Sequence, residues 1–319
     1  MADFREYELK PNNPRQEAFI KCNCDYVFFG GARGGSKTWS LSYDAALHVR
    51  EVVLEKDNGL VIDKEVKFSI DYPEYRALIL RRTYPMIKTV LEVCKPIYQK
   101  LGAKFNKKEM TFEFPSGATI QLGNCNEEDD VDKYIGGNYH YLGIDEANQF
   151  TWGMVERLLG SIRSTNPKLK TLVRLCSNPG GVGHLWLKEK FVDKCPPKVI
   201  GESIHKETGI TYPVKVEGKP YITMSGLMKQ TWQFIPSLVF DNPAIIKNDP
   251  QFVPKLLAQP EAVRKMWIYG DFGAYTGQWL DIWSDALHVI KNKDFVFGKK
   301  GMANKVCVSQ ETHDFYLGL

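Results

Sequence analysis

The sequence predicts an α/β fold in which a mainly parallel sheet is covered by helices on both faces. Short apolar runs alternate with segments of helical spacing, which is the order that parallel βαβ units need. No internal repeat or low-complexity stretch interrupts this order. The chain has 319 residues, of which 43% are hydrophobic and 25% charged, enough for one large α/β domain or two smaller ones.

The first predicted strand and helix enclose a glycine-rich loop. Residues 25–30, DYVFFG, are aromatic and β-branched, as in a short buried strand. The loop GGARGGS contains too much glycine for a strand or helix, and residues 37–55 have helical spacing. The apolar face of this helix is expected to comprise Leu41, Ala45, Val49 and Val52. Strand, glycine loop and helix are the context of a phosphate-binding loop.

The loop nearly matches the pattern G-x-x-x-x-G-K-[ST], starting at Gly31. Its N–H groups and the helix dipole are expected to surround a β-phosphate, with Lys37 bridging the β- and γ-phosphates and Thr38 ligating Mg²⁺. Only Ser36 departs from the pattern, and the cradle survives if the backbone there avoids a glycine-only conformation. The expected ATP-binding residues of the loop are Gly31, Ala32, Gly34, Gly35, Ser36, Lys37 and Thr38. The alternative is a glycine-rich turn that happens to precede a lysine.

A buried strand that ends in two acidic residues supplies the second half of the predicted site. Residues 139–144 are an apolar strand, and Asp145 and Glu146 follow it. We expect Asp145 to contact Mg²⁺, directly or through water, and Glu146 to polarise the water that attacks the γ-phosphate. Two carboxylates at a strand end are costly unless a cation or water network compensates them. The alternative is a helix start with Asp145 as its N-cap.

A third strand is predicted within residues 170–181, KTLVRLCSNPGG, and it ends in Ser177 and Asn178. In additional-strand ATPases this position carries a polar sensor of the γ-phosphate, and both side chains are short hydrogen-bonding groups suited to that role. The alternative is an ordinary turn after a strand.

Four further polar residues have open roles. Arg33, inside the loop, either reaches the γ-phosphate as an arginine finger in cis or faces solvent. Gln16 either reads the edge of adenine through its amide or is a surface glutamine. Arg81 and Arg82 follow a strand at residues 77–80, where basic side chains face the ligand crevice of a doubly wound sheet. Nucleotide, DNA and a neighbouring acidic loop are all possible partners for these two arginines.

The hydropathy, cysteine content and net charge of the chain exclude several classes of protein. No run of about eighteen apolar residues predicts a membrane span, and the charged N-terminus has no apolar signal core. The seven cysteines form no zinc pattern and are expected to be reduced and mostly buried. The net charge of +4 gives no argument for nucleic-acid binding, which must come from local basic patches.

In this order, the motifs resemble the ATPase domain of the large terminase subunit of tailed bacteriophages, which drives double-stranded DNA into an empty capsid. The resemblance covers roughly residues 10–285 and rests on Gln16, GGARGGSKT, LILRRT, YLGIDEA and LCSNPGG. Residues 241–278 look like the stretch that closes that domain and leads to the nuclease. The resemblance to large terminases implies an additional-strand, RecA-like P-loop NTPase fold, with ATP and Mg²⁺ as cofactors. The implied catalytic residues are Arg33, Lys37 and Glu146, the metal ligands Thr38 and Asp145, and the coupling residues Ser177 and Asn178.

The resemblance also implies partners and a location. These are double-stranded DNA bound without regard to sequence, the portal protein of the procapsid, the small terminase subunit and a homo-oligomeric ring at the portal. The implied location is the cytoplasm of a bacterial host, with no membrane partner. The candidate residues for contacts with the DNA backbone are Lys104, Lys107, Lys108, Arg163 and Lys168. The alternative is that these residues form a solvated charged surface.

Three segments are expected: an ATPase core at 1–183, a lid or C-terminal part of the ATPase domain at 184–270, and a linker with a truncated start of a nuclease domain at 271–319. About 35 residues after Ser284 are too few for the nuclease fold, so no nuclease activity is expected. Residues 110–124 and 209–226 are predicted as hairpins, and residues 249–267 as two short helices.

Two rival functions remain. A helicase-like translocase or repair ATPase shares the loop, the acidic pair and the sensor, but acts on single strands or unwinds duplex DNA. A nucleotide-binding assembly module that does not hydrolyse ATP is compatible with Ser36, although Lys37, Thr38, Asp145 and Glu146 argue against it.

Overall fold

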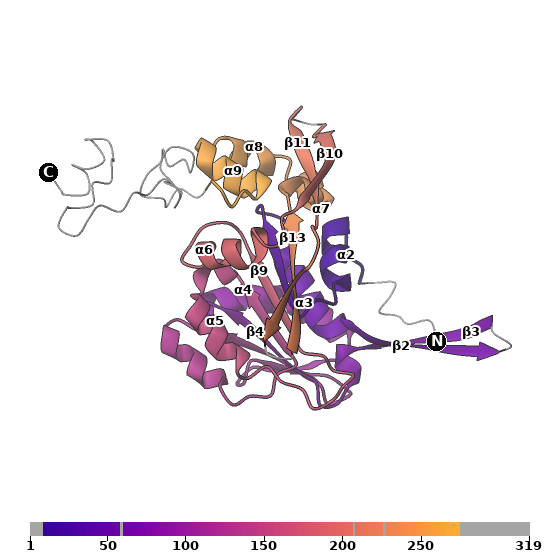
Figure 1. The fold of residues 1–319 in the computed structure, drawn as a ribbon. Helices are drawn as coiled ribbons and strands as arrows, with labels where there is room; N and C mark the ends of the chain where they lie inside the picture. Colours follow the sequence, from indigo (N-terminus) through magenta and orange to yellow (C-terminus); the bar gives the residue numbers. More distant parts are fainter. Residues whose placement is uncertain (1–8, 58–59, 207, 226–227, 275–319) are drawn as a thin grey trace, which may run out of the picture. The chain divides into compact units, whose positions relative to one another are not determined.

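The computed structural model describes residues 9–57, 60–206, 208–225 and 228–274, and nine strands of these ranges form one central sheet (Figure 1). Their bounds are β1 (Tyr26–Gly31), β4 (Arg76–Arg81), β5 (Lys104–Asn106), β6 (Thr111–Glu113), β7 (Thr119–Asn124), β8 (Tyr141–Asp145), β9 (Leu172–Ser177), β12 (Tyr221–Ser225) and β13 (Met228–Ser237). The order across the sheet is β12-β13-β1-β9-β8-β4-β7-β6-β5. The strands from β13 to β7 pair in parallel, and antiparallel strands extend both edges. The predicted mainly parallel sheet is therefore confirmed.

Helices cover both faces of this sheet, because successive residues of each strand point to opposite sides. Val27 and Phe29 of β1 pack with α2 (Pro14–Lys21), α3 (Lys37–Leu47) and α4 (Tyr84–Lys100). Phe28 packs in a second cluster, with α5 (Trp152–Leu159), α6 (His184–Leu187) and the π-helical turn Lys188–Val192. The predicted α/β class with two covered faces is confirmed.

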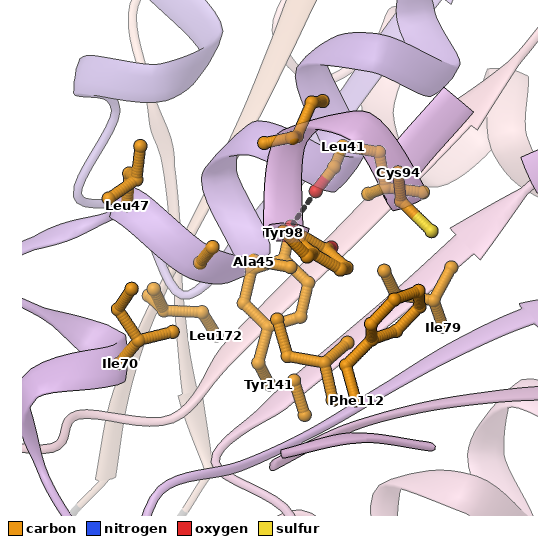
Figure 2. Packing of buried hydrophobic residues seen from close by; sticks show 14 of the residues in the cluster. Leu41, Ala45, Leu47, Ile70, Ile79, Cys94, Tyr98, Phe112, Tyr141 and Leu172 are labelled. Atoms are coloured by element: carbon orange, nitrogen blue, oxygen red, sulfur yellow. Dashed lines mark hydrogen bonds between the residues drawn. The ribbon is translucent and has the colours of Figure 1, made fainter. Parts of the chain in front are cut away.

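Three buried tyrosines fix α3, the helix that follows the glycine-rich loop. The hydroxyl groups of Tyr75, Tyr98 and Tyr141 donate to the carbonyl oxygens of Ala45, Ser42 and Leu41, at 2.6, 2.8 and 3.3 Å. Figure 2 shows Tyr98 and Tyr141 among the apolar side chains beneath α3, with Phe112 beside them. Ring burial and these bonds together hold α3 in one position on the sheet.

β9 lies between β1, which leads into the loop, and β8, which carries the acidic pair. This inserted strand defines the additional-strand arrangement, which is therefore confirmed. The carboxyl ends of all three strands meet at one edge of the sheet, where open α/β sheets bind ligands.

The helix predicted for residues 37–55 is too long. α3 ends at Leu47, and β2 (Val49–Asp57) and β3 (Leu60–Phe68) form an antiparallel hairpin. Val49 and Val52, expected on the apolar face of the helix, are 44% and 48% exposed. β-branched side chains favour the strand, and the pairing with residues 60–68 was not visible in the helical spacing.

One predicted hairpin is confirmed and the other is wrong. β6 and β7 pair in antiparallel fashion within residues 110–124, and the chain turns between Glu113 and Thr119. The described residues 209–225 do not pair with one another. β11 (Thr211–Val216) pairs with the preceding β10 (Lys198–Ile204), whereas β12 pairs with β13.

The last described segment folds back onto the glycine-rich loop. It contains α7 (Pro243–Asn248), α8 (Phe252–Leu257) and α9 (Glu261–Tyr269), so the two short helices predicted within residues 249–267 are confirmed. Ala32 of the loop packs with Val253, Leu256 and Ile268 in a third apolar cluster. β12 and β13, which follow residue 183, extend the central sheet, and the predicted boundaries at residues 183 and 270 stay predictions. Most of the segment predicted at 271–319 lies outside the described residues.

The cysteines of the described ranges are free thiols, and most of them are buried. Cys94, Cys125, Cys176 and Cys195 are buried free thiols, and Cys22 and Cys24 are free and half-buried. In the described part of the chain, no helix combines the length and the apolar character that crossing a membrane needs.

Candidate nucleotide-binding site

A cavity of about 780 Å³ opens where the carboxyl ends of β1, β8 and β9 meet. This volume lies within the range of small-molecule sites. The predicted site residues that line it are Arg33, Gly34, Gly35, Ser36, Lys37, Thr38, Asp145, Glu146 and Asn178. The structure therefore brings residues from three separate motifs to one place.

The glycines of the loop permit close backbone approach. Gly31 has a φ of 137°, and a Cβ there would lie 2.2 Å from the carbonyl oxygen of Ser237. A Cβ on Gly35 would lie 2.2 Å from the Ser237 hydroxyl oxygen. The amide of Ala32 donates to the Ser237 carbonyl at 2.7 Å. The end of β13 thus holds the loop from one side.

Ser36, the departure from the loop pattern, adopts the left-handed conformation with φ 53° and ψ 34°. This region favours glycine, so the serine backbone is strained. The side-chain amide of Asn242 compensates, because it donates to the Ser36 hydroxyl at 2.9 Å and to the Gly34 carbonyl at 2.5 Å. Asn242 is buried and also accepts a hydrogen bond from the amide of Ala244 at the start of α7. A side chain far along the sequence therefore supports the serine.

Lys37 lies at the start of α3, and its ammonium group folds back onto the loop. Its Nζ donates to the carbonyl oxygen of Ala32 at 2.5 Å. Burial lowers the pKa of Lys37, while the nearby carboxylates of Glu146 and Asp145 oppose that shift. A buried cation at this position attracts anionic ligands.

Thr38 and Asp145, the two predicted metal ligands, are in direct contact. The Thr38 hydroxyl donates to Oδ2 of Asp145 at 2.9 Å. Arg81 at the end of β4 donates to the same oxygen through Nε at 2.9 Å, and its Nη2 lies 2.7 Å from that oxygen in an ion pair. Nucleotide, DNA and a neighbouring acidic loop were the alternatives for the partner of Arg81, and its partner in the structure is the acidic pair.

Glu146 follows β8 and lines the cavity. Its backbone is left-handed, with φ 55°, and strain of this kind is concentrated at functional sites. Burial, followed by the neighbouring Asp145 carboxylate, raises the pKa of Glu146. The Arg81 guanidinium lies 3.7 Å from one Glu146 oxygen.

Arg33 faces the cavity but stacks on the last described segment. Its guanidinium carbon lies 3.5 Å from the centre of the Trp267 ring, and its amide donates to the Trp267 carbonyl at 2.9 Å. A cation over an indole ring is a favourable contact. α9 therefore holds the loop arginine in this position.

Asn178 is in the cavity, whereas Ser177 lies behind it. The Ser177 hydroxyl donates to the Asn178 carbonyl at 2.9 Å and accepts from the amide of Asn148 at 3.1 Å. The side-chain oxygens of Asn148 and Asn178 are buried and have no hydrogen-bond partner among the described residues. Both asparagines line the cavity, so a ligand could satisfy these atoms.

Gln16, the predicted adenine reader, is not among the residues that line the cavity. It is buried, its Oε1 accepts from the amide of Asn12 at 2.8 Å, and its Nε2 donates to the Ser36 carbonyl at 3.4 Å. In the structure Gln16 links α2 to the glycine-rich loop, and its contact with adenine stays a prediction.

The donor set fits a nucleotide with Mg²⁺. The hydroxyl of Thr38 and the carboxylate of Asp145 are oxygen donors, and Mg²⁺ is usually bound by one or two protein oxygens plus substrate phosphates. No group of three His, Cys, Asp or Glu side chains that could hold a metal occurs in the described ranges, so an all-protein metal cage is not seen there. Gly34, Gly35, Ser36 and Lys37 line the cavity, so their backbone N–H groups and the Lys37 ammonium are the groups that fit phosphates. The unpaired side-chain oxygens of Asn148 and Asn178 accept hydrogen bonds and fit a bound water or a donor group instead.

The remaining predicted basic residues lie elsewhere. Arg82 donates to the Cys125 carbonyl at 3.0 Å, away from the cavity lining. Lys104, Lys107 and Lys108 are exposed at the β5–β6 edge of the sheet, whereas Arg163 and Lys168 precede β9. Sequence reasoning missed Asn148, Asn242 and Trp267, because nothing local distinguishes these residues from ordinary loop or helix residues.

The strand, loop and helix at residues 26–47, with the acidic pair two strands away, define a P-loop NTPase of additional-strand, RecA-like fold. The sequence matches the family of terminase large subunits, T4likevirus type, N-terminal part, over residues 28–297. The chain belongs to this family, and the predicted resemblance to large terminases is confirmed.

Solved structures are similar in fold. The large terminase of the thermophilic bacteriophage D6E aligns with a TM-score of 0.51 at 12% identity, covering 82% of this chain and 54% of that one. The D6E terminase in complex with ADP aligns with a TM-score of 0.50 at 13% identity, over 82% and 54% of the two chains. The large terminase ATPase domain of Thermus phage P74-26 aligns with a TM-score of 0.49 at 14% identity, over 85% and 98%. This chain therefore spans about half the length of the D6E terminase. No curated protein matches the chain.

Proposed function

We propose that this chain hydrolyses ATP and uses the energy to translocate double-stranded viral DNA into a procapsid. The observation that carries the proposal is the convergence of Lys37, Thr38, Asp145 and Glu146 on one cavity, in a chain of the terminase large subunit family. The D6E relative with a similar fold binds ADP, which supports a nucleotide in this cavity.

The proposed hydrolysis uses the chain's own residues as follows. The loop amides and Lys37 would hold the β- and γ-phosphates, and Thr38 and Asp145 would hold Mg²⁺, which would supply positive charge next to the phosphates. Glu146 orients the attacking water and accepts its proton, a role that suits a carboxylate whose pKa is raised. Arg33 is close enough to the cavity to stabilise developing charge once it leaves Trp267.

The proposed coupling runs through the segment that contacts the loop. Asn178, which lines the cavity, is the proposed sensor of the γ-phosphate, and the segment that contains α7 to α9 contacts the loop through Asn242 and Trp267. Loss of the γ-phosphate then changes the contacts of this segment. DNA, the portal protein, a small terminase subunit and a homo-oligomeric ring at the portal in the bacterial cytoplasm are the proposed partners and setting.

A steady-state ATPase assay with and without double-stranded DNA tests the proposal. We expect Mg²⁺-dependent turnover that DNA stimulates, and Glu146→Gln is expected to reduce it by at least about a hundredfold, since the general base is lost. Glu156→Gln on the exposed face of α5 makes the same chemical change outside the site and is expected to leave turnover unchanged.

Three outcomes decide between the functions. DNA-stimulated turnover without strand separation supports packaging, whereas unwinding of a duplex supports a helicase-like translocase. Equal background turnover in the wild type and in Glu146→Gln would contradict catalysis and leave a nucleotide-binding module.

A further inference from the structure

Arg81 forms an ion pair with the acidic pair in the structure. The guanidinium makes two contacts to Oδ2 of Asp145, at 2.9 and 2.7 Å, and lies 3.7 Å from Glu146. The Arg81 side chain is only 12% exposed and that of Asp145 only 3%. This ion pair is therefore shielded from solvent, where a charge contact is stronger than at the surface.

Arg81 is also fixed from the opposite side. Its Nη1 donates to the hydroxyl of Thr89 at 3.1 Å, and Thr89 in turn donates to the Met86 carbonyl at 2.7 Å. β4 supplies the backbone position and α4 supplies this second anchor, so the guanidinium is held in place on two sides. Arginine remains protonated at all physiological pH values, so the positive charge is permanent.

We propose that Arg81 is a positioning residue that neutralises Asp145 when no nucleotide is bound and thereby prevents Mg²⁺ from binding alone. This inference rests on the proposed nucleotide site. Mg²⁺ requires several oxygen ligands and enters sites of this kind with substrate phosphates. With Asp145 already paired, the protein alone offers the metal little net negative charge, and the phosphates of the nucleotide supply the remainder. The metal then enters as a complex with the nucleotide.

The proposal has a consequence that simple structural damage would not produce. Removing the Arg81 charge should increase the affinity of the nucleotide-free protein for a divalent cation. We expect the affinity to increase roughly tenfold. Even with water-like screening, the repulsion between a unit charge and a divalent ion a few ångströms apart is large enough to change the affinity by about that factor.

The test is a titration of the nucleotide-free full chain with Mn²⁺, followed by the electron paramagnetic resonance signal of the free ion. Arg81→Gln is expected to bind Mn²⁺ about tenfold more tightly than the wild type. Arg81→Lys keeps the charge and should bind as weakly as the wild type. Arg82→Gln removes the same charge one residue further along, where the side chain contacts the Cys125 carbonyl, and should change nothing.

A double variant places the effect at the acidic pair. The gain in Arg81→Gln should disappear when Asp145→Asn is added, because the metal then lacks its carboxylate. No gain in Arg81→Gln, or an equal gain in Arg82→Gln, would overturn the proposal. Thermal denaturation of each variant shows whether it is folded, and only a gain of affinity in a folded Arg81→Gln variant supports the proposal.

Failure of this inference is distinguishable from failure of the proposed function. Binding of a fluorescent ATP analogue to the wild type with Mg²⁺ tests the nucleotide site by itself. Nucleotide binding without the Mn²⁺ effect would remove the role of Arg81 and leave the site intact. The Mn²⁺ effect without nucleotide binding would contradict the proposed function alone.

Discussion

Replacing Asn242 by alanine is expected to lower the free energy of unfolding by about 2–4 kcal/mol. The side-chain amide donates to the Gly34 carbonyl and to the Ser36 hydroxyl, and each lost bond costs about 0.5–1.5 kcal/mol. The same side chain caps α7 by accepting from the Ala244 amide, and loss of a cap costs about 1 kcal/mol.

A double-mutant cycle separates the contact with Ser36 from the other two. Ser36→Gly removes about 1–2 kcal/mol of left-handed backbone strain and loses one hydrogen bond, so its own effect is expected to be small. In the Ser36→Gly background, Asn242→Ala loses one bond fewer. The expected coupling energy between the two positions is therefore about 1 kcal/mol.

Equilibrium unfolding in urea gives the four free energies, and fluorescence of a labelled ADP gives nucleotide affinity in parallel. Asn242→Asp is the matched control, because it keeps the oxygen that caps α7 but loses the donor to the loop. We expect Asn242→Asp to weaken nucleotide binding nearly as much as Asn242→Ala does. A coupling energy of zero, or normal nucleotide binding by Asn242→Asp, would refute the idea that this side chain supports the loop.

Further expected outcomes concern the core and the hairpin, and each is measured by chemical or thermal denaturation. Leu41→Ala should cost about 2–5 kcal/mol because the side chain is fully buried, whereas Val53→Thr on the exposed hairpin should change stability by less than about 0.5 kcal/mol. Equal effects would contradict the observed end of α3. Arg174→Ala should cost about 3–5 kcal/mol, since it leaves the Asp44 carboxylate buried and its Oδ2 without the 3.1 Å partner; a loss below about 1 kcal/mol would argue against that pairing. Gly31→Ala should cost at least about 1–3 kcal/mol through its positive φ, and a fully stable variant would contradict the loop geometry.

The strands that carry the candidate site could be predicted because parallel strands buried on both faces are continuous apolar runs. Residues 139–144 and 170–177 show this pattern, and each is followed by polar side chains at the ligand-binding edge. Since strand ends of a parallel sheet share one edge, Asp145 and Asn178 were expected near Lys37, and the cavity lining includes all three.

The end of α3 could not be predicted from local spacing. Leu41, Ala45, Val49 and Val52 continue a helical face, and nothing near them in sequence contradicts it. The outcome is decided by pairing with residues 60–68, and strand preference depends on such partners more than helix preference does.

The side chains that contact the glycine-rich loop and the acidic pair from a distance could not be predicted for a related reason. Asn242 is 208 residues from Gly34, and Arg81 is 64 residues from Asp145. Periodicity and motif spacing report contacts within one element, whereas these contacts depend on how distant elements pack. These contacts form only when distant elements pack together, so the sequence around each of the two residues gives no sign of its partner.

The place of β13 beside β1 has a consequence for synthesis on the ribosome. Trp232, the sheet partner of Tyr26, is translated roughly two hundred residues after it. The carbonyl of Ser237, which receives the Ala32 amide, arrives later still. Until β13 has been synthesised, one flank of β1 is therefore an open strand edge, which is the feature that aggregation exploits. The glycine-rich loop therefore gains its hydrogen bond to β13 only after residue 237 has been synthesised, long after the loop itself.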